Sequence, residues 1–451
     1  MAGRMFTGAI ACATLLSLQA GAQSVTDMAV LRGLSPVTVL SKSEAGRAAL
    51  GANYTVTGGI QTGELRQPTL WQFAEQQQLA LRDVFITRGN LAQLADGLGT
   101  TLGAAYVARA HYVDRDTFTS ISKPVADVIA YALAAARSSS NSGKYFFANL
   151  TTDGKKPVSD EARAIIEKNG GAADMFGKAY GFPAGSAGAG RYGDARPFQT
   201  EVSFARIVGR DYFGTPSDNT VYNRGPMMDL INSPSFPSGH TTYGYMGSLL
   251  LAVMVPERYG EMIARGAEYG NSRIMVGAHY AMDVLGGRAL AYHDMAHLLA
   301  NDPAYVGQVH KGAPQIGDFR GAVAKAREDV RKVLEAACGK PMAECAREDI
   351  GRFSDPAANE AFYASTHTYG LPTVFPRAAA AAVDVNRVAP EAGYLLTVAF
   401  PSLTLAQANG ILTQTLGPGG GFIDDGSPFG VYSRINLYAA SRQAAKVAAT
   451  R

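Results

Sequence analysis

Six polar or charged side chains between residues 196 and 283 constrain this chain more than any other feature. They are Arg196, Ser238, His240, Arg273, His279 and Asp283. Ser238-Gly239-His240 directly precede the apolar run 241–255, which predicts that they lie at the N-terminus of a helix. His279 and Asp283 are four residues apart in a second helical pattern, so their side chains are expected on one helical face. Arg273 is expected at or just before the start of that helix.

Helical patterning also dominates the rest of the sequence, and strand-like alternation is scarce before the C-terminal third. The predicted fold class is therefore mainly α. Helices are expected at 70–83, 91–108, 125–137, 160–168 and 318–337. The polar run 138–143 is expected to close the third of these helices. A Gly/Thr-rich piece at 54–63 belongs to a mixed leader, and short elements and loops are expected from about Pro372 to Tyr438.

Residues 1–22 have the three-part order of a secretory signal peptide. Arg4 is followed by an apolar run at 9–18 and by Ala20-Gly21-Ala22. Cleavage is predicted after Ala22, and the mature chain is expected in the periplasm or outside the cell. No other window reaches the roughly 18 to 20 apolar residues that a transmembrane helix needs, so a soluble mature chain is expected.

The composition describes an ordinary folded protein, with 47% hydrophobic and 18% charged residues. A net charge of +3 is too small to indicate a nucleic-acid partner or a polybasic membrane surface, so the expected partner is a small molecule. Cys338 and Cys345 flank a short segment with Gly and Pro, which predicts a disulfide in an oxidising compartment. The sequence leaves the oligomeric state open.

The side chains between 196 and 283 supply the parts that phosphoryl transfer needs. Such a site requires positive groups around the phosphoryl oxygens, a nucleophile in line with the leaving oxygen, and an acid to protonate that oxygen. A helix N-terminus at Ser238-Gly239 favours an anion, and the planar fork of Arg273 suits bidentate phosphate binding. Asp283 can hold one nitrogen of His279 and leave the other nitrogen free to attack phosphorus. Small phosphate esters are therefore the expected substrates.

Two motifs in this stretch resemble two of the three motifs of the type 2 phosphatidic acid phosphatase (PAP2) superfamily. They are Pro237-Ser238-Gly239-His240 and Ser272-Arg273-x5-His279-x3-Asp283. That superfamily includes the soluble bacterial class A nonspecific acid phosphatases, which this chain resembles most in character, and the vanadium-dependent haloperoxidases. The resemblance covers roughly residues 125–300 and implies a helical-bundle catalytic core there. A leader at 23–124 would precede that core, and a C-terminal extension at 301–451 would follow it.

The resemblance also implies a role for each matched residue. His279 would attack phosphorus to form a phosphohistidine and would be oriented by Asp283, while His240 would protonate the leaving alcohol and then activate water. The phosphoryl group would be held by Arg196, Ser238, Gly239 and Arg273. This scheme uses no metal ion or other cofactor. Because His240 must start protonated and His279 must start neutral, a mildly acidic optimum is expected.

The remaining motif of the family, Lys-x6-Arg-Pro, is incomplete in this chain. Arg196-Pro197 are present, but Ala189 stands where the lysine is expected. Arg191, two residues further on in the Gly-rich loop 181–193, is one candidate for the missing charge, and Lys178 is another. If neither replaces the lysine, a lower rate is expected rather than no activity, because two arginines remain.

Three other functions remain open from the sequence. A vanadium-dependent haloperoxidase would hold vanadate with the same residue set, although the missing lysine weakens that alternative. A soluble lipid-phosphate or isoprenoid-phosphate phosphatase would fit the motifs without the membrane spans typical of such relatives. A catalytically silent protein would bind a phosphorylated ligand at an incomplete site.

Further patterns in the sequence are interpreted as structural. GAGRYG at 188–193 lacks the preceding strand and the βαβ context of a dinucleotide-binding turn. His293 and His297 have the spacing of a zinc-binding helix, but no third ligand is identifiable. Asp424 and Asp425 fit a solvated turn better than a cation site.

Overall fold

A computed structural model describes most of the chain. The described residues are 23–65, 72–85, 89–114, 117–169, 193–200, 206–219, 230 and 233–450. Three sequence predictions fall outside them. These are the signal peptide at 1–22, the GAGRYG segment apart from Gly193, and the two candidate cations Arg191 and Lys178 with Ala189.

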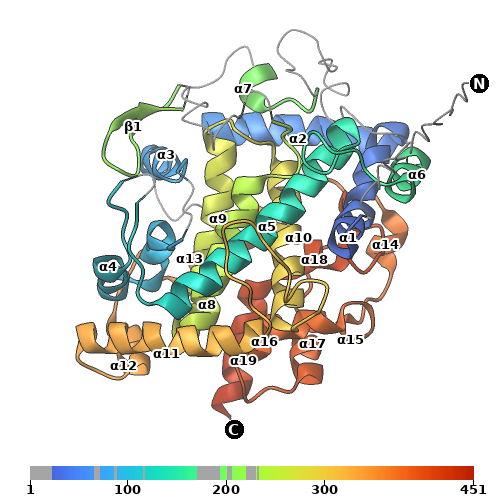
Figure 1. Cartoon of the computed structure of the whole chain (residues 1–451). Helices are drawn as coiled ribbons and strands as arrows, with labels where there is room; N and C mark the ends of the chain where they lie inside the picture. Colours follow the sequence, from blue (N-terminus) through green and yellow to red (C-terminus); the bar gives the residue numbers. More distant parts are fainter. Residues whose placement is uncertain are drawn as a thin grey trace, which may run out of the picture.

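The centre of the described structure is a bundle of long helices (Figure 1). They are α5 (Lys123–Asn149), α8 (Gly239–Met254), α9 (Tyr259–Met275) and α10 (Ala281–Leu299). Short connections join α8 to α9 and α9 to α10, so consecutive helices run in opposite directions. The N-terminus of α8, the C-terminus of α9 and the N-terminus of α10 therefore meet at one end of the bundle. The predicted mainly α fold is confirmed.

α8 and α10 are buried on nearly every face, which explains the length and apolar character of the runs that form them. A helix that is apolar all round can be stable only inside a larger core. α8 ends at Met254, where Pro256 stops it and begins the short 3₁₀ helix η3 (Pro256–Arg258). The N-termini of α8 and α10, which meet at one end of the bundle, thus belong to helices that are packed into the core.

Helices of the leader pack along this bundle and across its end. They are α1 (Val25–Leu34), η1 (Ser35–Lys42), α2 (Glu44–Thr62), α3 (Phe73–Arg82), η2 (Ala92–Leu98) and α4 (Thr100–Arg109). α2 lies across the same end of the bundle as α7 (Pro197–Thr200), as Figure 1 shows. The Gly/Thr-rich piece at 54–63 is helical up to Thr62, and Gly63 ends α2 in the left-handed conformation (φ 77°).

Two predicted helices differ from the structure for identifiable reasons. The segment predicted at 91–108 is divided by Gly99, whose φ of 119° separates η2 from α4. The helix predicted at 125–137 does not end at the polar run 138–143 but continues to Asn149. Gly143 packs against Leu34 and Pro237 so closely that a Cβ atom would lie 2.9 Å from the leucine. Tertiary packing of small residues therefore overrides the weak helix propensity of this run.

Of the remaining elements, α11 (Phe319–Cys338) is the longest, with 20 residues. α6 (Asp160–Lys168) and α11 lie where the sequence predicted them. The C-terminal part continues as α12 (Met342–Glu348), α13 (Pro356–Thr368), α14 (Pro376–Ala380), α15 (Val385–Val388), η4 (Pro390–Gly393), α16 (Tyr394–Thr397), α17 (Leu405–Gln414), α18 (Gly430–Arg434) and α19 (Leu437–Ala449). β1 (Val208–Arg210) and β2 (Pro216–Asp218) form a small antiparallel pair in which Gly209 lies opposite Ser217.

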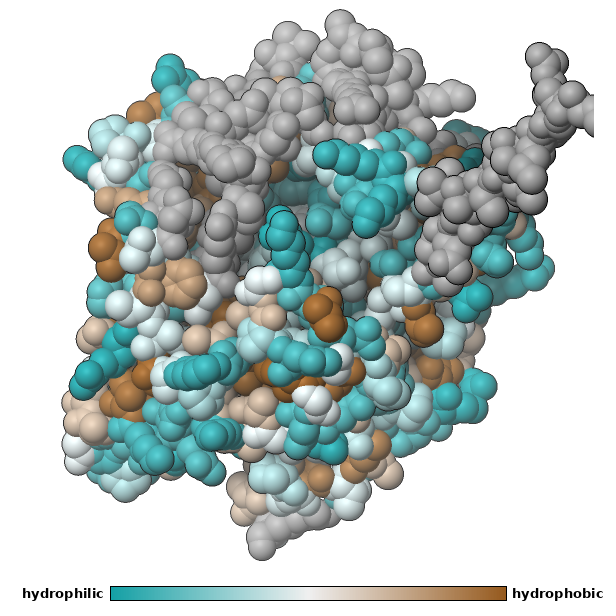
Figure 2. All heavy atoms as spheres, viewed as in Figure 1, coloured by the Kyte–Doolittle hydropathy of each residue, from teal (hydrophilic) through white to brown (hydrophobic). Residues whose placement is uncertain are grey.

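The predicted disulfide is present in the structure. Cys338 and Cys345 form a disulfide between α11 and α12, with their Cα atoms 6.2 Å apart. Among the described helices, none combines the length and the apolar character that a membrane crossing requires. On the face shown in Figure 2, hydrophilic side chains dominate the coloured surface and apolar ones form small separate groups.

Candidate active site

Ser238-Gly239-His240 lie at the N-terminus of α8, as predicted. Ser238 is the N-cap, and its Oγ accepts a hydrogen bond from Thr241 N at 3.2 Å. Ser238 N donates to Asp283 O at 3.0 Å, which ties this helix start to the start of α10. The backbone N–H groups of Gly239 and His240 have no acceptor among the described residues. They therefore remain available to an anion at the end of the helix.

His279 precedes α10 by two residues, which corrects the prediction that His279 and Asp283 share a helical face. Asp283 lies in the first turn of α10, and its Oδ2 accepts hydrogen bonds from Tyr280 N at 3.0 Å and from Ser235 Oγ. His279 Nδ1 lies 3.2 Å from the same oxygen. The two side chains thus meet at the N-terminus of α10, where a carboxylate is favoured. They do not lie one turn apart on the surface of a continuous helix.

Arg196 fixes the other side of the His279 ring. Its Nη1 donates to Ala278 O at 2.9 Å and lies 3.0 Å from His279 Nε2. Nη1 also lies 3.4 Å from Nδ1, so Asp283 decides the tautomer. A carboxylate beside Nδ1 accepts a hydrogen from that nitrogen, which places the lone pair on Nε2. The remaining N–H groups of Arg196 donate to Leu230 O at 2.8 Å, Ser233 Oγ at 2.8 Å and Pro234 O at 2.9 Å. The geometry therefore leaves Nε2 of His279 as the free nucleophilic nitrogen.

Arg273 was predicted at or just before the start of the helix that carries Asp283, but it lies in the last turn of the preceding helix, α9. Its side chain is fully buried, and a cation is favourable at a helix C-terminus. The neighbouring Ser272 belongs to the same motif but points elsewhere, because its Oγ donates to Asp83 Oδ2 at 3.1 Å. Asp83 in turn accepts two hydrogen bonds from Arg265, at 2.7 and 2.9 Å. Ser272 thus anchors the end of α9 beside Arg273.

Burial and positive charge lower the pKa of both histidines well below its usual value. For His240 the cause after burial is the positive charge of Arg273 and then of Arg196. For His279 burial is again the largest cause, followed by Arg196. His240 Nε2 has no hydrogen-bond partner among the described residues. Burial raises the pKa of Asp283. Burial and the nearby cations therefore favour the neutral form of both imidazoles, and the charge of a bound anion would oppose this effect.

Three residues that the motifs do not contain also belong to the site. Ser235 binds Asp283 through its hydroxyl group. Asp194 accepts a hydrogen bond from Phe236 N at 2.9 Å and so fixes the segment that precedes Ser238. Lys144 contacts the same segment from α5, because its Nζ donates to Pro234 O at 2.6 Å. Asp194 stands two residues before Arg196, so motif proximity could have indicated it, whereas Lys144 is distant in sequence and carries no local signal.

The leader, in which the sequence showed no chemistry, supplies polar contacts to the site through α2. Asn53, Thr57 and Gln61 are four residues apart and form a buried stripe on this helix. Asn53 Oδ1 accepts from Met282 N at 2.9 Å, and Thr57 Oγ1 accepts from Ala281 N at 3.1 Å. Gln61 Nε2 donates to Ile274 O at 3.2 Å. These side chains satisfy the free backbone groups where α9 ends and α10 begins, on either side of His279.

The secondary motifs do not join the site. The rings of His293 and His297 lie 4.5 Å apart and are tilted by 56°, and His297 Nδ1 pairs with Asp302 Oδ2 at 2.7 Å. Asp424 Oδ2 accepts from Gly420 N at 2.7 Å within its turn. In the part of the chain that the structure describes, no group of three or more His, Cys, Asp or Glu residues could hold a metal ion.

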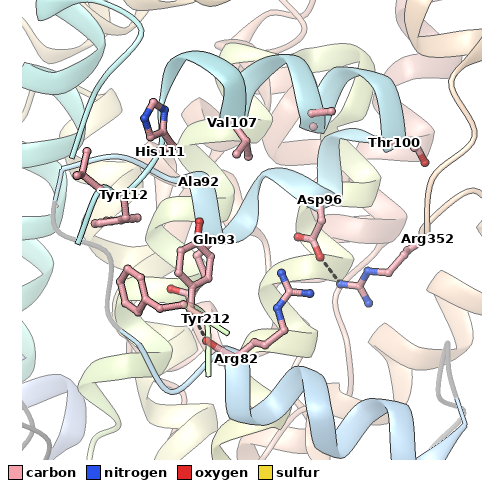
Figure 3. Close-up of a pocket in the computed structure, with 15 residues that line it drawn as sticks. Arg82, Ala92, Gln93, Asp96, Thr100, Val107, His111, Tyr112, Tyr212 and Arg352 are labelled. Atoms are coloured by element: carbon pink, nitrogen blue, oxygen red, sulfur yellow. Dashed lines mark hydrogen bonds and ion pairs between the residues drawn. The ribbon is translucent and has the colours of Figure 1, made fainter. Parts of the chain in front are cut away.

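A separate pocket of about 700 Å³ lies between α3, η2 and α4 (Figure 3). Arg82, Tyr112 and Tyr212 line it, and Asp96 pairs with Arg352 at 2.7 Å across one side. Its lining contains none of the residues of the candidate active site. Asp96 also binds Arg265 at 2.8 Å, so the ion pairs beside this pocket support the same arginine that holds Asp83 and the end of α9.

Sequence comparison defines the class of this region. Residues 187–300 match the model of the PAP2 superfamily, which confirms the predicted resemblance. That range contains Arg196, both histidines, Arg273 and Asp283, and it excludes α5 and α2.

Curated bacterial phosphatases are similar to part of the chain. The non-specific acid phosphatase of Providencia stuartii is 28% identical over 162 residues, which are 34% of this chain and 63% of that protein. The non-specific acid phosphatase of Salmonella typhimurium is 37% identical over 96 residues, 21% of this chain and 38% of that protein. The acid phosphatase of Zymomonas mobilis is 35% identical over 103 residues, 23% of this chain and 33% of that protein. The chain thus spans less than two thirds of the length of these relatives.

Proposed function

We propose that this chain is an exported phosphatase that hydrolyses phosphomonoesters through a phosphohistidine on His279. The observation that carries the proposal is the pair of hydrogen bonds on the His279 ring, from Arg196 to Nε2 and from Nδ1 to Asp283. They leave a lone pair on Nε2 beside buried arginines. The names of the curated relatives, acid phosphatase and non-specific acid phosphatase, support the same reaction class. Export rests on the sequence of residues 1–22.

In the first half of the reaction, His279 Nε2 attacks phosphorus and the bond from phosphorus to the ester oxygen breaks. Arg196 can pass its hydrogen bond from Nε2 to a phosphoryl oxygen as the substrate enters, which exposes the lone pair. Arg273 and the N–H groups at the start of α8 stabilise the oxygens of the transferring group. His240 gives its proton to the leaving oxygen, so the product is a neutral alcohol.

In the second half, neutral His240 removes a proton from water, and the resulting hydroxide attacks phosphorus. The bond from phosphorus to His279 Nε2 breaks, inorganic phosphate leaves, and His240 is again protonated for the next cycle. Asp283 keeps the hydrogen on Nδ1 in both halves and stabilises the positive charge that the ring acquires when it is phosphorylated. Each proton transfer is thus assigned to a side chain, and the scheme uses no metal ion.

The test is phosphate release by the purified chain from a panel of phosphate esters, with a chelator present. We expect turnover that His279→Ala abolishes. His310→Ala serves as the matched control, because this partly buried histidine contacts Tyr131 and lies outside the site. That variant should retain the rate of the unmodified chain.

The same panel separates the alternatives. Oxidation of bromide with vanadate and peroxide, without phosphate release, would identify a haloperoxidase and overturn the proposal. Release confined to lipid or isoprenoid phosphates would narrow the substrate class. Binding of phosphate without any hydrolysis would identify a silent binding protein.

A further inference from the structure

The sequence leaves one position of the expected phosphate site without its cation, since Ala189 stands where a lysine belongs. Within the described residues, a buried lysine reaches the site from a different element. Lys144 lies on α5, which crosses the bundle beside α8 (Figure 1), and its side chain is only 8% exposed. A lysine is almost never buried unless its ammonium group is paired with a charged or polar group.

The position of Lys144 is defined by contacts with the start of α8. A Cβ atom on Gly239 would lie 3.6 Å from Lys144 Cε and 3.0 Å from Ser140 Oγ. Ser140 and Lys144 are one helical turn apart on α5, so both face the first residues of α8. Ser140 Oγ is buried and has no hydrogen-bond partner among the described residues. These two donors therefore lie against the free N–H groups at this helix end.

Two cations share a single carbonyl oxygen at this point. Lys144 Nζ donates to Pro234 O at 2.6 Å, and Arg196 Nη2 donates to the same oxygen at 2.9 Å. The like charges repel each other in a buried environment, and Lys144 lowers the pKa of both His240 and His279. An anion bound beside these groups would offset the repulsion. Such clustering of buried positive charge is the arrangement that an oxyanion site requires.

Arg196 has its N–H groups engaged by backbone and side-chain acceptors, whereas Lys144 keeps donor capacity. The second acceptor of Lys144 is Ser235 O, at 3.4 Å, and an ammonium group has three donors. At least one N–H of Lys144 is therefore without an acceptor among the described residues. Burial, followed by the charge of Arg196, lowers the pKa of Lys144, while Asp194 and Asp283 raise it. A bound phosphate would favour the charged form in the same way.

We propose that Lys144 is a catalytic residue that binds the transferring phosphoryl group and takes the place of the lysine missing at Ala189. The proposal rests on the proposed function for the reaction it serves. The ammonium group would donate to a phosphoryl oxygen from α5, beside the guanidinium group of Arg196. The positive charge that the family motif assigns to a lysine seven residues before Arg196 would thus come from Lys144. Lys144 lies on a helix outside residues 187–300, the region that matches the PAP2 superfamily.

The test compares Lys144→Gln and Lys144→Met with the unmodified chain, by calorimetric binding of inorganic phosphate and by kcat/KM for a phosphate ester. Gln can still donate a hydrogen bond to Pro234 O, so it keeps a purely structural tie but removes the charge. We expect both variants to bind phosphate at least about tenfold more weakly and to lose about 10²- to 10³-fold in kcat/KM. Lys123→Gln is the matched control, because Lys123 lies on the same helix with its side chain 80% exposed. It should change neither quantity.

The outcomes separate this inference from the proposed function. If Lys144→Gln melts at the temperature of the unmodified chain and binds phosphate as tightly, the inference is wrong, while hydrolysis that depends on His279 would still stand. If the unmodified chain releases no phosphate from any ester, the proposed function fails, and phosphate binding alone still decides the role of Lys144. If Lys144→Met does not fold, Lys144→Gln gives the answer. An unmodified chain that binds no phosphate overturns the inference.

Discussion

His279 depends on its neighbours for both the direction and the protonation state of its ring. Arg196 meets Nε2 from one side, and Asp283 accepts the hydrogen of Nδ1 from the other. The motif spacing predicted the pairing of His279 with Asp283 but not its geometry, because the same spacing fits a helix surface and a helix N-terminus. Ser235 holds Asp283 in place and stands two residues before the motif that begins at Pro237, but only the fold shows that it contacts His279 and Asp283, which are 44 and 48 positions away.

Asp283→Asn should retain the shape of the site but disturb the tautomer of His279. The amide can present an N–H to Nδ1, which would move the ring hydrogen to Nε2 and remove the nucleophilic lone pair. We expect kcat to fall by about 10²- to 10⁴-fold, while the affinity for inorganic phosphate changes little. Asp302→Asn is the control, since Asp302 forms the equivalent contact with His297 outside the site. Equal losses in both variants would contradict the assignment.

The pH dependence follows from the direction of the histidine pKa shifts. His240 must be protonated to act as the acid, and burial with the charge of Arg273 lowers its pKa. A lowered pKa means that the protonated form is lost at a lower pH, so kcat/KM should decline as pH rises through acidic values. Bound phosphate offsets the cations, so the decline of kcat should have its midpoint at higher pH. A rate that stays flat from about pH 4 to about pH 9 would contradict the two-histidine scheme.

Elements far apart in the sequence hold the loop that carries His279. α2 comes from the leader, yet the polar side chains buried along it accept hydrogen bonds from the first backbone N–H groups of α10. The sequence predicted helices where the apolar period was strong, as at 160–168 and 318–337. It could not predict that α5 continues through 138–143 or that α2 includes 54–62, because the helix propensities of small and polar residues are weak and tertiary packing overrides them. Lys144 was missed for the same reason, since it lies beyond the predicted end of its helix.

Thr57→Val tests the support that α2 gives to the site. Valine has nearly the volume of threonine but cannot accept the hydrogen bond from Ala281 N. Leaving that buried N–H without an acceptor should cost about 1 to 2 kcal/mol of unfolding free energy and lower kcat by about tenfold through displacement of His279. Thr55→Val is the control, because Thr55 is exposed on the same helix and bonds only to Gly51 O. A melting curve and a kinetic assay are needed, and unchanged kcat in Thr57→Val would refute the positioning role.

At the scale of the whole molecule, the site end and the disulfide end of the bundle lie apart. α7 and α2 mark one end in Figure 1, and α11 and α12 run along the other. The spacing of Cys338 and Cys345 allowed their pairing to be predicted, since closing a short segment needs no knowledge of the fold. The packing of the leader across the site could not be predicted in this way, because it depends on contacts more than 200 residues apart, such as Thr57 with Ala281.

Reduction of the disulfide should destabilise the molecule without changing the chemistry. It joins residues seven positions apart. Closing a loop of that size lowers the conformational entropy of the unfolded chain, which raises the free energy of unfolding by about 2.5 kcal/mol. Thermal melting in the presence of a thiol reductant should therefore occur at a lower temperature. At temperatures where both forms stay folded, kcat should be the same, and a large loss of kcat on reduction would show that this end of the molecule affects the site.

Transfer of a phosphoryl group to His279 can be tested by trapping the phosphorylated enzyme. The chain is mixed rapidly with a phosphate ester that has a good leaving group and is quenched in alkali, where phosphohistidine survives. Peptide mass spectrometry then locates the group. We predict phosphate on His279, none in His279→Ala, and more in His240→Ala, because that variant lacks the base that activates water. Phosphate on another residue, or hydrolysis with inversion of configuration at phosphorus, would contradict the account.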